Sequence, residues 1–357
     1  MKTIFKNACV NGKLTDFTVE DGKFVSFEKT AEPGLDLGGK RVLPGLMDVH
    51  IHGGVGCDVM DGGDAMPTIS AFLAKNGVTS FLPTTMTMGM DTIREALAVD
   101  PAEAKGAKAL GYHLEGPYIA MSRRGAQNPA FIRKPDLKEF ETLPNVRMVT
   151  IAPEEDEELA FTKNCKAVVS VGHTDATFEQ TAAALDAGAV CLTHTFNAMP
   201  PLLHRAPGPI GAAIEKNAYV QLICDGFHVM KSTVLMLYRT FGRERVVLIS
   251  DAIRATGFPD GHYEFGGQEI VVAGGHATLL DGTVAGSTST LLNDVKTAIS
   301  FGIPEEDALY MASRTPAKLM GENKGLLEPG FDADFIVTDE DLNIFATFVG
   351  GNKVYEV

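Results

Sequence analysis

The chain alternates short apolar runs with segments of helical periodicity, and this alternation is its main fold signal. Apolar runs of strand length lie at residues 43–52, 79–85, 109–116, 147–154, 167–174, 189–197, 219–228 and 245–252. Helices or loops are predicted between them, for example at 68–77, 177–188 and 230–242, and the last two segments close on a Gly suited to a helix C-cap. Eight parallel strands with crossover helices predict a closed (β/α)8 barrel. A doubly wound open sheet shares the pattern, but no G-x-G-x-x-G motif follows the first run.

Both ends of the chain differ from this pattern. Residues 1–42 and 335–357 contain short strand-like pieces separated by Gly and Asp. We expect the two ends to pair into one small β-sandwich outside a barrel of residues 43–334. Within that range, the Gly-rich residues 258–285 are predicted to be an excursion after the eighth strand.

Composition and charge narrow the classes of protein. A chain of 357 residues that is 45% hydrophobic can bury the core of a large barrel and a small accessory domain. The net charge of −15 argues against nucleic acid and against an anionic membrane as partners, but a local site for a small anion is still compatible with it. Since no apolar run resembles a signal peptide or a membrane span, we expect a cytoplasmic protein. The five cysteines form no CxxC motif, so neither a disulfide framework nor a zinc ribbon is indicated.

Polar, chemically capable side chains gather where the apolar runs end. Active sites of (β/α)8 barrels lie at the carboxyl ends of the strands. Buried polar groups need partners, so several histidines and carboxylates on different strands are hard to explain as core filler. The residues at these ends are His50, His52, Glu115, His173, His194, His228 and Asp251.

Two sets of these residues are candidate metal ligands. Glu115, His173 and His194 end three different runs and form the kind of three-ligand set that leaves room for a catalytic water. His50 and His52 are separated by one residue, so on a strand they share a face. An isolated His-x-His pair favours a structural role, but the position of this pair in PGLMDVHIHG, on the first strand, favours metal binding. Such ligands suit zinc, and also iron, cobalt or manganese.

Asp251 and His113 complete the inward-facing set. A carboxylate beside a metal-bound water can act as general base and then as general acid, which is the role we expect for Asp251. The alternative is a carboxylate that caps the following loop. His113 shares a face with Glu115, and we expect it to support or pack against the site rather than bind metal.

The order and spacing of several motifs resemble a known family. PGLMDVHIHGG, HLEGPYI, VGHTDAT, THTFNAMPPLLHR, CDGFHV and SDA precede LDGTVAGSTST and KGLLEPGFDADFIV. Over essentially the whole chain they resemble the N-acetylglucosamine-6-phosphate deacetylases of the amidohydrolase superfamily. The resemblance implies a metal-dependent amidohydrolase barrel that releases acetate and D-glucosamine 6-phosphate in amino-sugar catabolism and cell-wall recycling. It further implies Glu115, His173 and His194 as main ligands and Asp251 as catalytic aspartate. The pair His50 and His52 is the version that permits a second ion in the family, so one or two ions per subunit are expected.

Substrate contacts also follow from the resemblance. Asn197 and Ala198 correspond to a substrate-contacting loop, while His228 and Arg205 correspond to residues that hold the sugar phosphate. In the family the Arg reaches across a homodimer interface; without the resemblance Arg205 would be interpreted as a solvated loop residue. Gln127 stands where relatives commonly have His in a Gly-Ala-His segment. A Gln amide donates a hydrogen bond but carries no proton or charge, so we expect Gln127 to contact substrate with an altered effect on rate or selectivity.

Related activities and an inactive protein are the alternatives. The fourth run ends in Ala152-Pro153-Glu154 without a Lys, so the carbamylated lysine of the dihydroorotase and hydantoinase branches has no candidate, and Glu115 takes the bridging place. A deacetylase of another N-acyl sugar, such as N-acetylgalactosamine 6-phosphate, remains open. So does a non-catalytic amidohydrolase-like binding protein, although the complete ligand set argues against it.

Overall fold

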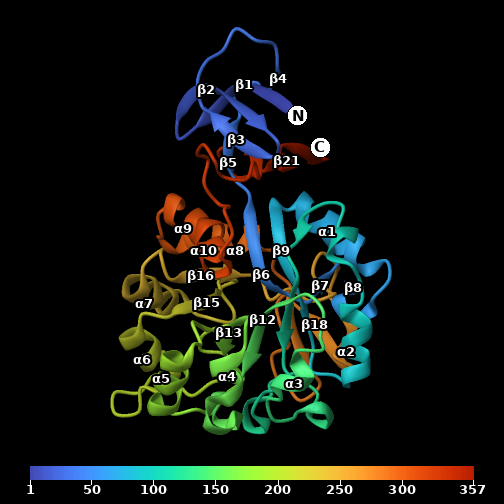
Figure 1. The fold of residues 1–357 in the computed structure, drawn as a ribbon, viewed down its shortest axis with the longest axis vertical. Helices are drawn as coiled ribbons and strands as arrows, with labels where there is room; N and C mark the ends of the chain where they lie inside the picture. Colours follow the sequence, from blue (N-terminus) through green and yellow to red (C-terminus); the bar gives the residue numbers. More distant parts are fainter.

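Eight parallel strands form the barrel in the computed structural model, which describes residues 1–357 (Figure 1). Each barrel strand pairs with the next one along the chain. The short strand β10 (Lys108–Ala109) comes just before β11, and both pair in parallel with β9. Backbone bonds from Asp251 N to His50 O and from His52 N to Ala252 O, of 3.0 and 2.8 Å, bring the last strand against the first. The predicted (β/α)8 barrel is therefore confirmed. Its strands are β6 (Leu46–Ile51), β9 (Val78–Thr85), β11 (Tyr112–Glu115), β12 (Val146–Ile151), β13 (Val168–Val171), β14 (Cys191–Leu192), β15 (Tyr219–Ile223) and β16 (Val246–Ile249).

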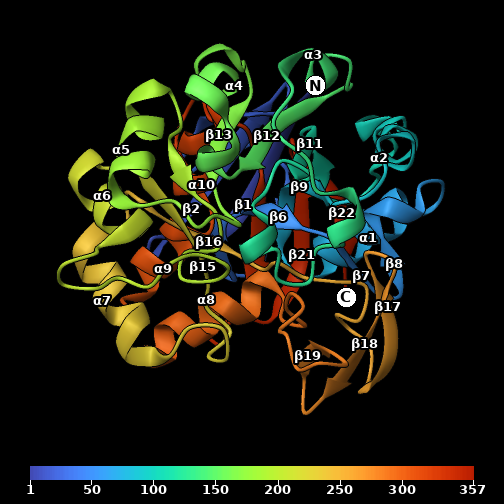
Figure 2. The ribbon, with the colours of Figure 1, turned by 90° about the horizontal axis from the view of Figure 1, so that it is seen from below.

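Helices surround these strands (Figure 2). The predicted segment 177–188 is α5, which begins with a capping box between Thr177 and Gln180 and ends at Gly188, where φ is 125°. Segments 68–77 and 230–242 correspond to α1 and α7. The helices are α1 (Ala65–Lys75), α2 (Met90–Leu97), α3 (Leu137–Phe140), α4 (Ala160–Asn164), α5 (Phe178–Ala187), α6 (Gly208–Lys216), α7 (Lys231–Phe241), α8 (Leu291–Phe301), α9 (Glu305–Met311) and α10 (Arg314–Met320).

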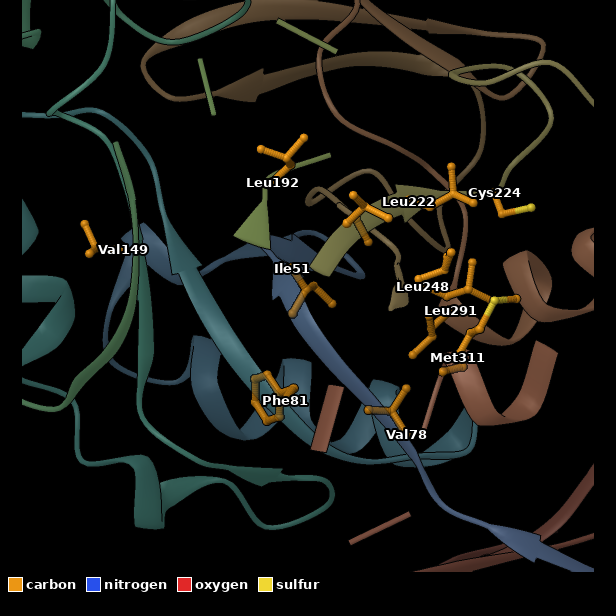
Figure 3. Close-up of a cluster of buried hydrophobic side chains, with 14 of the residues drawn as sticks. Ile51, Val78, Phe81, Val149, Leu192, Leu222, Cys224, Leu248, Leu291 and Met311 are labelled. Carbon is orange, nitrogen blue, oxygen red and sulfur yellow. The ribbon is translucent and has the colours of Figure 1, made fainter. Parts of the chain in front are cut away.

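The main core lies between the strands and the helices. Successive side chains of a strand point to opposite faces, so Val246 and Leu248 of β16 pack outward while Val247 and Ile249 pack inward. Figure 3 shows outward-facing strand residues near side chains of α8 and α9. Those labelled include Ile51, Phe81, Val149, Leu192, Leu222 and Leu248, together with Leu291 and Met311.

The barrel interior is layered along its axis. Val247, Ile249 and Met47 belong to an apolar cluster that α10 closes with Leu319 and Met320. Above this cluster lies a polar layer, in which every member except Gln221 bonds to another member across strands. This layer contains His113, Thr150, Ser170, Thr193 and Gln221. Beyond it, at the carboxyl ends of the strands, lies the candidate site.

Both chain ends build one small sheet at the opposite end of the barrel (Figure 1). β5 (Arg41–Pro44) pairs with β1 (Lys2–Val10) on one side and with β20 (Phe335–Thr338) on the other, which joins the two termini. Phe5 stacks on Phe17 at 4.8 Å and meets Phe335 edge-on at 5.1 Å in a separate core. The remaining strands are β2 (Lys13–Glu20), β3 (Lys23–Ser26), β4 (Leu35–Asp36), β21 (Ile344–Val349) and β22 (Asn352–Glu356).

The first apolar run divides between these two parts at Gly45. β5 belongs to the small sheet and β6 to the barrel. A Cβ at Gly45 would lie 2.3 Å from the side chain of Thr79, so only Gly allows this close approach. The domain boundaries predicted at residues 43 and 335 stay predictions, and residues 43–44 lie in the small sheet.

The excursion after the eighth strand is a three-stranded antiparallel sheet. It consists of β17 (Gly261–Phe265), β18 (Gln268–Ala273) and β19 (His276–Leu279), and it lies beside the barrel mouth (Figure 2). A short ribbon of β7 (Gly53–Gly54) and β8 (Cys57–Asp58) follows the first barrel strand. All five cysteines are unpaired, as expected. No helix has the length and apolar character needed to cross a membrane.

Candidate active site and metal centre

The predicted ligands converge at the barrel mouth from separate strands. Glu115 is the last residue of β11, while His173, His194 and Asp251 each lie two residues beyond a strand. These three have φ of 47°, 25° and 48°, a left-handed conformation that costs about 1–3 kcal/mol per residue and clusters at functional sites. The turn out of each strand thus directs a side chain over the barrel axis.

The carboxylate of Glu115 contacts four histidines of the site. Its Oε1 lies 3.2 Å from Nε2 of His173 and 3.0 Å from Nε2 of His194, and these two nitrogens are 3.1 Å apart. The same Oε1 is 3.4 Å from Nε2 of His50, and Oε2 is 3.3 Å from Nε2 of His52. The carboxylate is therefore shared between two groups of ligand atoms.

Asp251 belongs to the second group. Its Oδ1 lies 3.4 Å from Nε2 of His50 and 3.2 Å from Nε2 of His52, and the two ring nitrogens are 3.3 Å apart. The structure thus brings together two buried triads that could each hold a cation: His50, His52 and Asp251, and Glu115, His173 and His194. Asp251 therefore contacts His50 and His52 rather than only capping the following loop.

Hydrogen bonds at the far side of the imidazoles fix their orientation. Nδ1 of His52 lies 3.2 Å from the carbonyl oxygen of Thr84, and Nδ1 of His173 lies 2.9 Å from the carbonyl oxygen of Arg123. A carbonyl only accepts, so each Nδ1 carries a proton, and Nε2 is the nitrogen that faces the centre. Ring nitrogens 3.1 and 3.3 Å apart, with carboxylate oxygens beside them, favour positive charge between them, either a proton or a metal ion. The residues therefore fit one or two divalent cations.

The charges of the site point the same way. Burial alone would raise the pKa of Glu115 and of Asp251, but the neighbouring histidines hold the pKa of Glu115 well below its usual range and lower that of Asp251 to about 2. Burial disfavours a charged His52, yet hydrogen bonds and charges from Asp251 and Glu115 raise its pKa to about 10. Two ionised carboxylates at the bottom of a cavity attract cations.

The polar layer below supports the ligands. Oε1 of Gln221 lies 3.1 Å from Nδ1 of His50 and accepts the backbone N–H of His194 at 3.3 Å. His113 bonds through Nε2 to Thr150 at 2.8 Å, and burial lowers its pKa well below the usual value, so its neutral form is favoured. Sequence analysis missed Gln221, although a lone polar residue inside the apolar run YVQLI was a usable signal.

A cavity opens above the ligands and contains most predicted substrate residues. Asn197, Ala198, His228 and Gln127 line it with His173, His194, Glu115, His52 and Asp251. Sequence analysis did not predict that the excursion also contributes to its wall. The excursion contributes Phe265, Thr283 and Val284, and the cavity is also lined by Gly125, Ala126 and Gly286.

Gln127 and Arg205 lie differently from the other predicted contacts. Gln127 lines the cavity, but Nε2 of its amide donates to Oε2 of Glu115 at 2.6 Å. Arg205 lies in the exposed segment 201–206, outside the residues that line the cavity, and forms no ion pair. The predicted contact of Arg205 with a sugar phosphate stays a prediction.

Comparisons with known proteins agree with this chemistry. The Amidohydrolase family matches residues 41–354. The chain is 36% identical to an N-acetylglucosamine-6-phosphate deacetylase of Bacillus subtilis (strain 168), over 99% of this chain and 94% of that one. It is 35% identical to an N-acetylgalactosamine-6-phosphate deacetylase of Escherichia coli O157:H7, over 93% of each.

A solved structure is similar along the whole chain. It is a mutant N-acetyl-D-glucosamine-6-phosphate deacetylase from Mycobacterium smegmatis in complex with N-acetyl-D-glucosamine-6-phosphate. The TM-score is 0.90 with 34% sequence identity, and the match covers 99% of each chain. The barrel and the small sheet thus have counterparts in one known fold.

Proposed function

We propose that this chain, which belongs to the Amidohydrolase family, hydrolyses the acetamide of N-acetyl-D-glucosamine 6-phosphate to D-glucosamine 6-phosphate and acetate. The observation that carries the proposal is Glu115 shared between His173 and His194 on one side and the His50, His52 and Asp251 group on the other. Relatives over essentially the full length bear this activity in their names.

Glu115, His173 and His194 would hold the principal divalent cation, and His50, His52 and Asp251 a second one. We propose zinc, and iron, cobalt or manganese suit the same ligands. The chemistry that such a cation supplies when bound is Lewis acidity, which lowers the pKa of water and stabilises negative charge on a carbonyl oxygen. The bonds from Nδ1 of His52 and His173 to backbone carbonyl oxygens keep Nε2 of each ring directed at the ion.

Asp251 would move the proton. Its pKa of about 2 keeps it ionised at neutral pH, so it can accept a proton from the attacking water. Delivery of that proton to the amine nitrogen then releases the amino sugar, because an unprotonated amide nitrogen is a poor leaving group. Asp251 lines the same cavity as His228 and Asn197, which would orient the sugar.

Contacts with the phosphate would involve a second subunit. Arg205 is exposed beside Leu203, whose side chain is 53% exposed. We propose a homodimer in which Arg205 of one subunit reaches the phosphate bound by the other. An Arg offers a planar fork of donors for phosphate oxygens. A cytoplasmic location stays a prediction.

Acetate release by Asp251→Asn, paired with metal analysis, tests the mechanism. Loss of a general acid and base lowers kcat by about 10²–10⁴-fold. Near wild-type turnover with unchanged metal content would remove Asp251 from the reaction. An inert wild-type protein that binds metal would favour the non-catalytic alternative.

The epimer N-acetyl-D-galactosamine 6-phosphate is a second candidate substrate, because a relative of similar identity is named for it. We propose comparing kcat/KM for both phosphorylated epimers and for the unphosphorylated sugars. A higher value for the galactosamine compound would replace the proposed substrate. Indifference to phosphate would contradict the roles proposed for Arg205 and His228.

A further inference from the structure

Gln127 makes two short hydrogen bonds inside the barrel mouth. Its Oε1 accepts the backbone N–H of Thr87 at 2.7 Å, and its Nε2 donates to Oε2 of Glu115 at 2.6 Å. Only 4% of Gln127 is exposed, so water does not compete for these bonds. The side chain therefore bridges a backbone amide and the shared carboxylate of the site.

The direction of the amide is fixed by chemistry. A backbone N–H only donates, so the atom that faces Thr87 must be the amide oxygen. The reverse orientation would set an NH2 against that N–H and a carbonyl oxygen against Glu115, which are two repulsive contacts. Nε2 also lies 3.8 Å from the sulfur of Met86. Its donors are thus directed at protein atoms, which leaves none for a substrate carbonyl in this arrangement.

We propose that Gln127 is a positioning residue for Glu115 rather than a contact to the reacting amide. Oε1 of Glu115 lies 3.0 and 3.2 Å from two ligand nitrogens, so rotation of the carboxylate would disrupt the ligand set. A hydrogen bond on Oε2 opposes that rotation. The Gln127 amide is neutral, so it holds the carboxylate in place without adding a second positive charge beside the cation.

The backbone around Gln127 is itself held in place. Its N–H donates to the carbonyl oxygen of Arg124 at 2.9 Å, and Gln268 of β18 donates through Nε2 to the carbonyl oxygen of Ala126 at 2.6 Å. The bond from Gln268 reaches the same loop but not Glu115. It therefore offers a matched control.

The inference rests on the proposed metal site, and metal release tests it without any substrate. Gln127→Met keeps the length and volume of the side chain and removes its donor. Loss of a partner that orients a ligand typically weakens metal affinity by about 10–100-fold. We expect zinc-loaded Gln127→Met to lose metal to a chelator at least about 10-fold faster than wild type. Gln268→Met should lose it at the wild-type rate.

Kinetics at saturating zinc separate the two roles of Gln127. For Gln127→Met we expect a KM within about twofold of wild type, because no substrate contact is removed. Gln127→Asn is one methylene too short to reach both partners, so it should also release metal faster than wild type. Wild-type metal retention in Gln127→Met with a raised KM would overturn the inference and favour direct substrate contact. A wild-type protein that holds no metal would instead overturn the proposed function.

Discussion

Oδ2 of Asp225 accepts a hydrogen bond of 2.6 Å from Nδ1 of His228. Oδ1 of the same carboxylate accepts the backbone N–H groups of Phe227 and His228, both at 2.9 Å. Burial would raise the pKa of Asp225, but the bonds and charge of His228 lower it, so the carboxylate is ionised. Because His228 lines the cavity and its Nδ1 is occupied, Nε2 is the nitrogen that can reach a substrate.

Asp225→Asn is expected to raise KM by about 10-fold with a smaller change in kcat. The reason is that His228 loses a charge-assisted hydrogen bond, which is worth about 1.5 kcal/mol more than the neutral bond that Asn could make. Steady-state kinetics on N-acetyl-D-glucosamine 6-phosphate measure both constants. Asp186→Asn is the control, because Asp186 is exposed and pairs only with Lys216, and neither residue lines the cavity. Equal KM values for wild type and Asp225→Asn would show that this pair does not serve binding.

Much of the fold and site could be predicted from the sequence, because both depend on local patterns. Alternation with a period of two places Val247 and Ile249 inside the barrel, and the carboxyl ends of parallel strands necessarily meet. For that reason Glu115, His173 and His194 could be expected in one place before any coordinates were considered. The structure adds the left-handed turns that direct the two histidines inward.

The parts of the site that could not be predicted from the sequence depend on contacts between distant segments. Gln221 orients His50 across 171 residues of chain, and nothing near either residue signals the pairing. Phe265 meets the ring of His52 at 5.3 Å because the excursion folds back to the mouth. The contact of Gln127 with Glu115 was unexpected, since an amide can serve substrate or ligand equally well and only its partners decide.

The two triads predict two metal ions per chain. His52→Gln should lower the content of reconstituted protein from two ions to one, because it removes a ligand from the second triad only. Metal analysis after gel filtration measures this directly. His262→Gln is the control, because that histidine is exposed on β17 and pairs with Glu269 away from the site. Two ions retained in His52→Gln, or one in wild type, would contradict a filled second site.

Acid should selectively weaken the small β domain through Asp16, which is buried in β2. Lys6, at 2.7 Å, and the backbone N–H of Thr30 hold the pKa of Asp16 well below its usual value. A depressed folded-state pKa stabilises the protein above the unfolded pKa of about 4, and this stabilisation is lost as pH falls below it. Asp16→Asn should therefore cost about 2 kcal/mol of stability at pH 7 and progressively less below about pH 4. Melting temperatures of wild type and variant across this range measure the difference, with Glu20→Gln on the exposed side of the same strand as control. A constant gap between wild type and Asp16→Asn at all pH values would mean that Asp16 acts through packing and not through its charge.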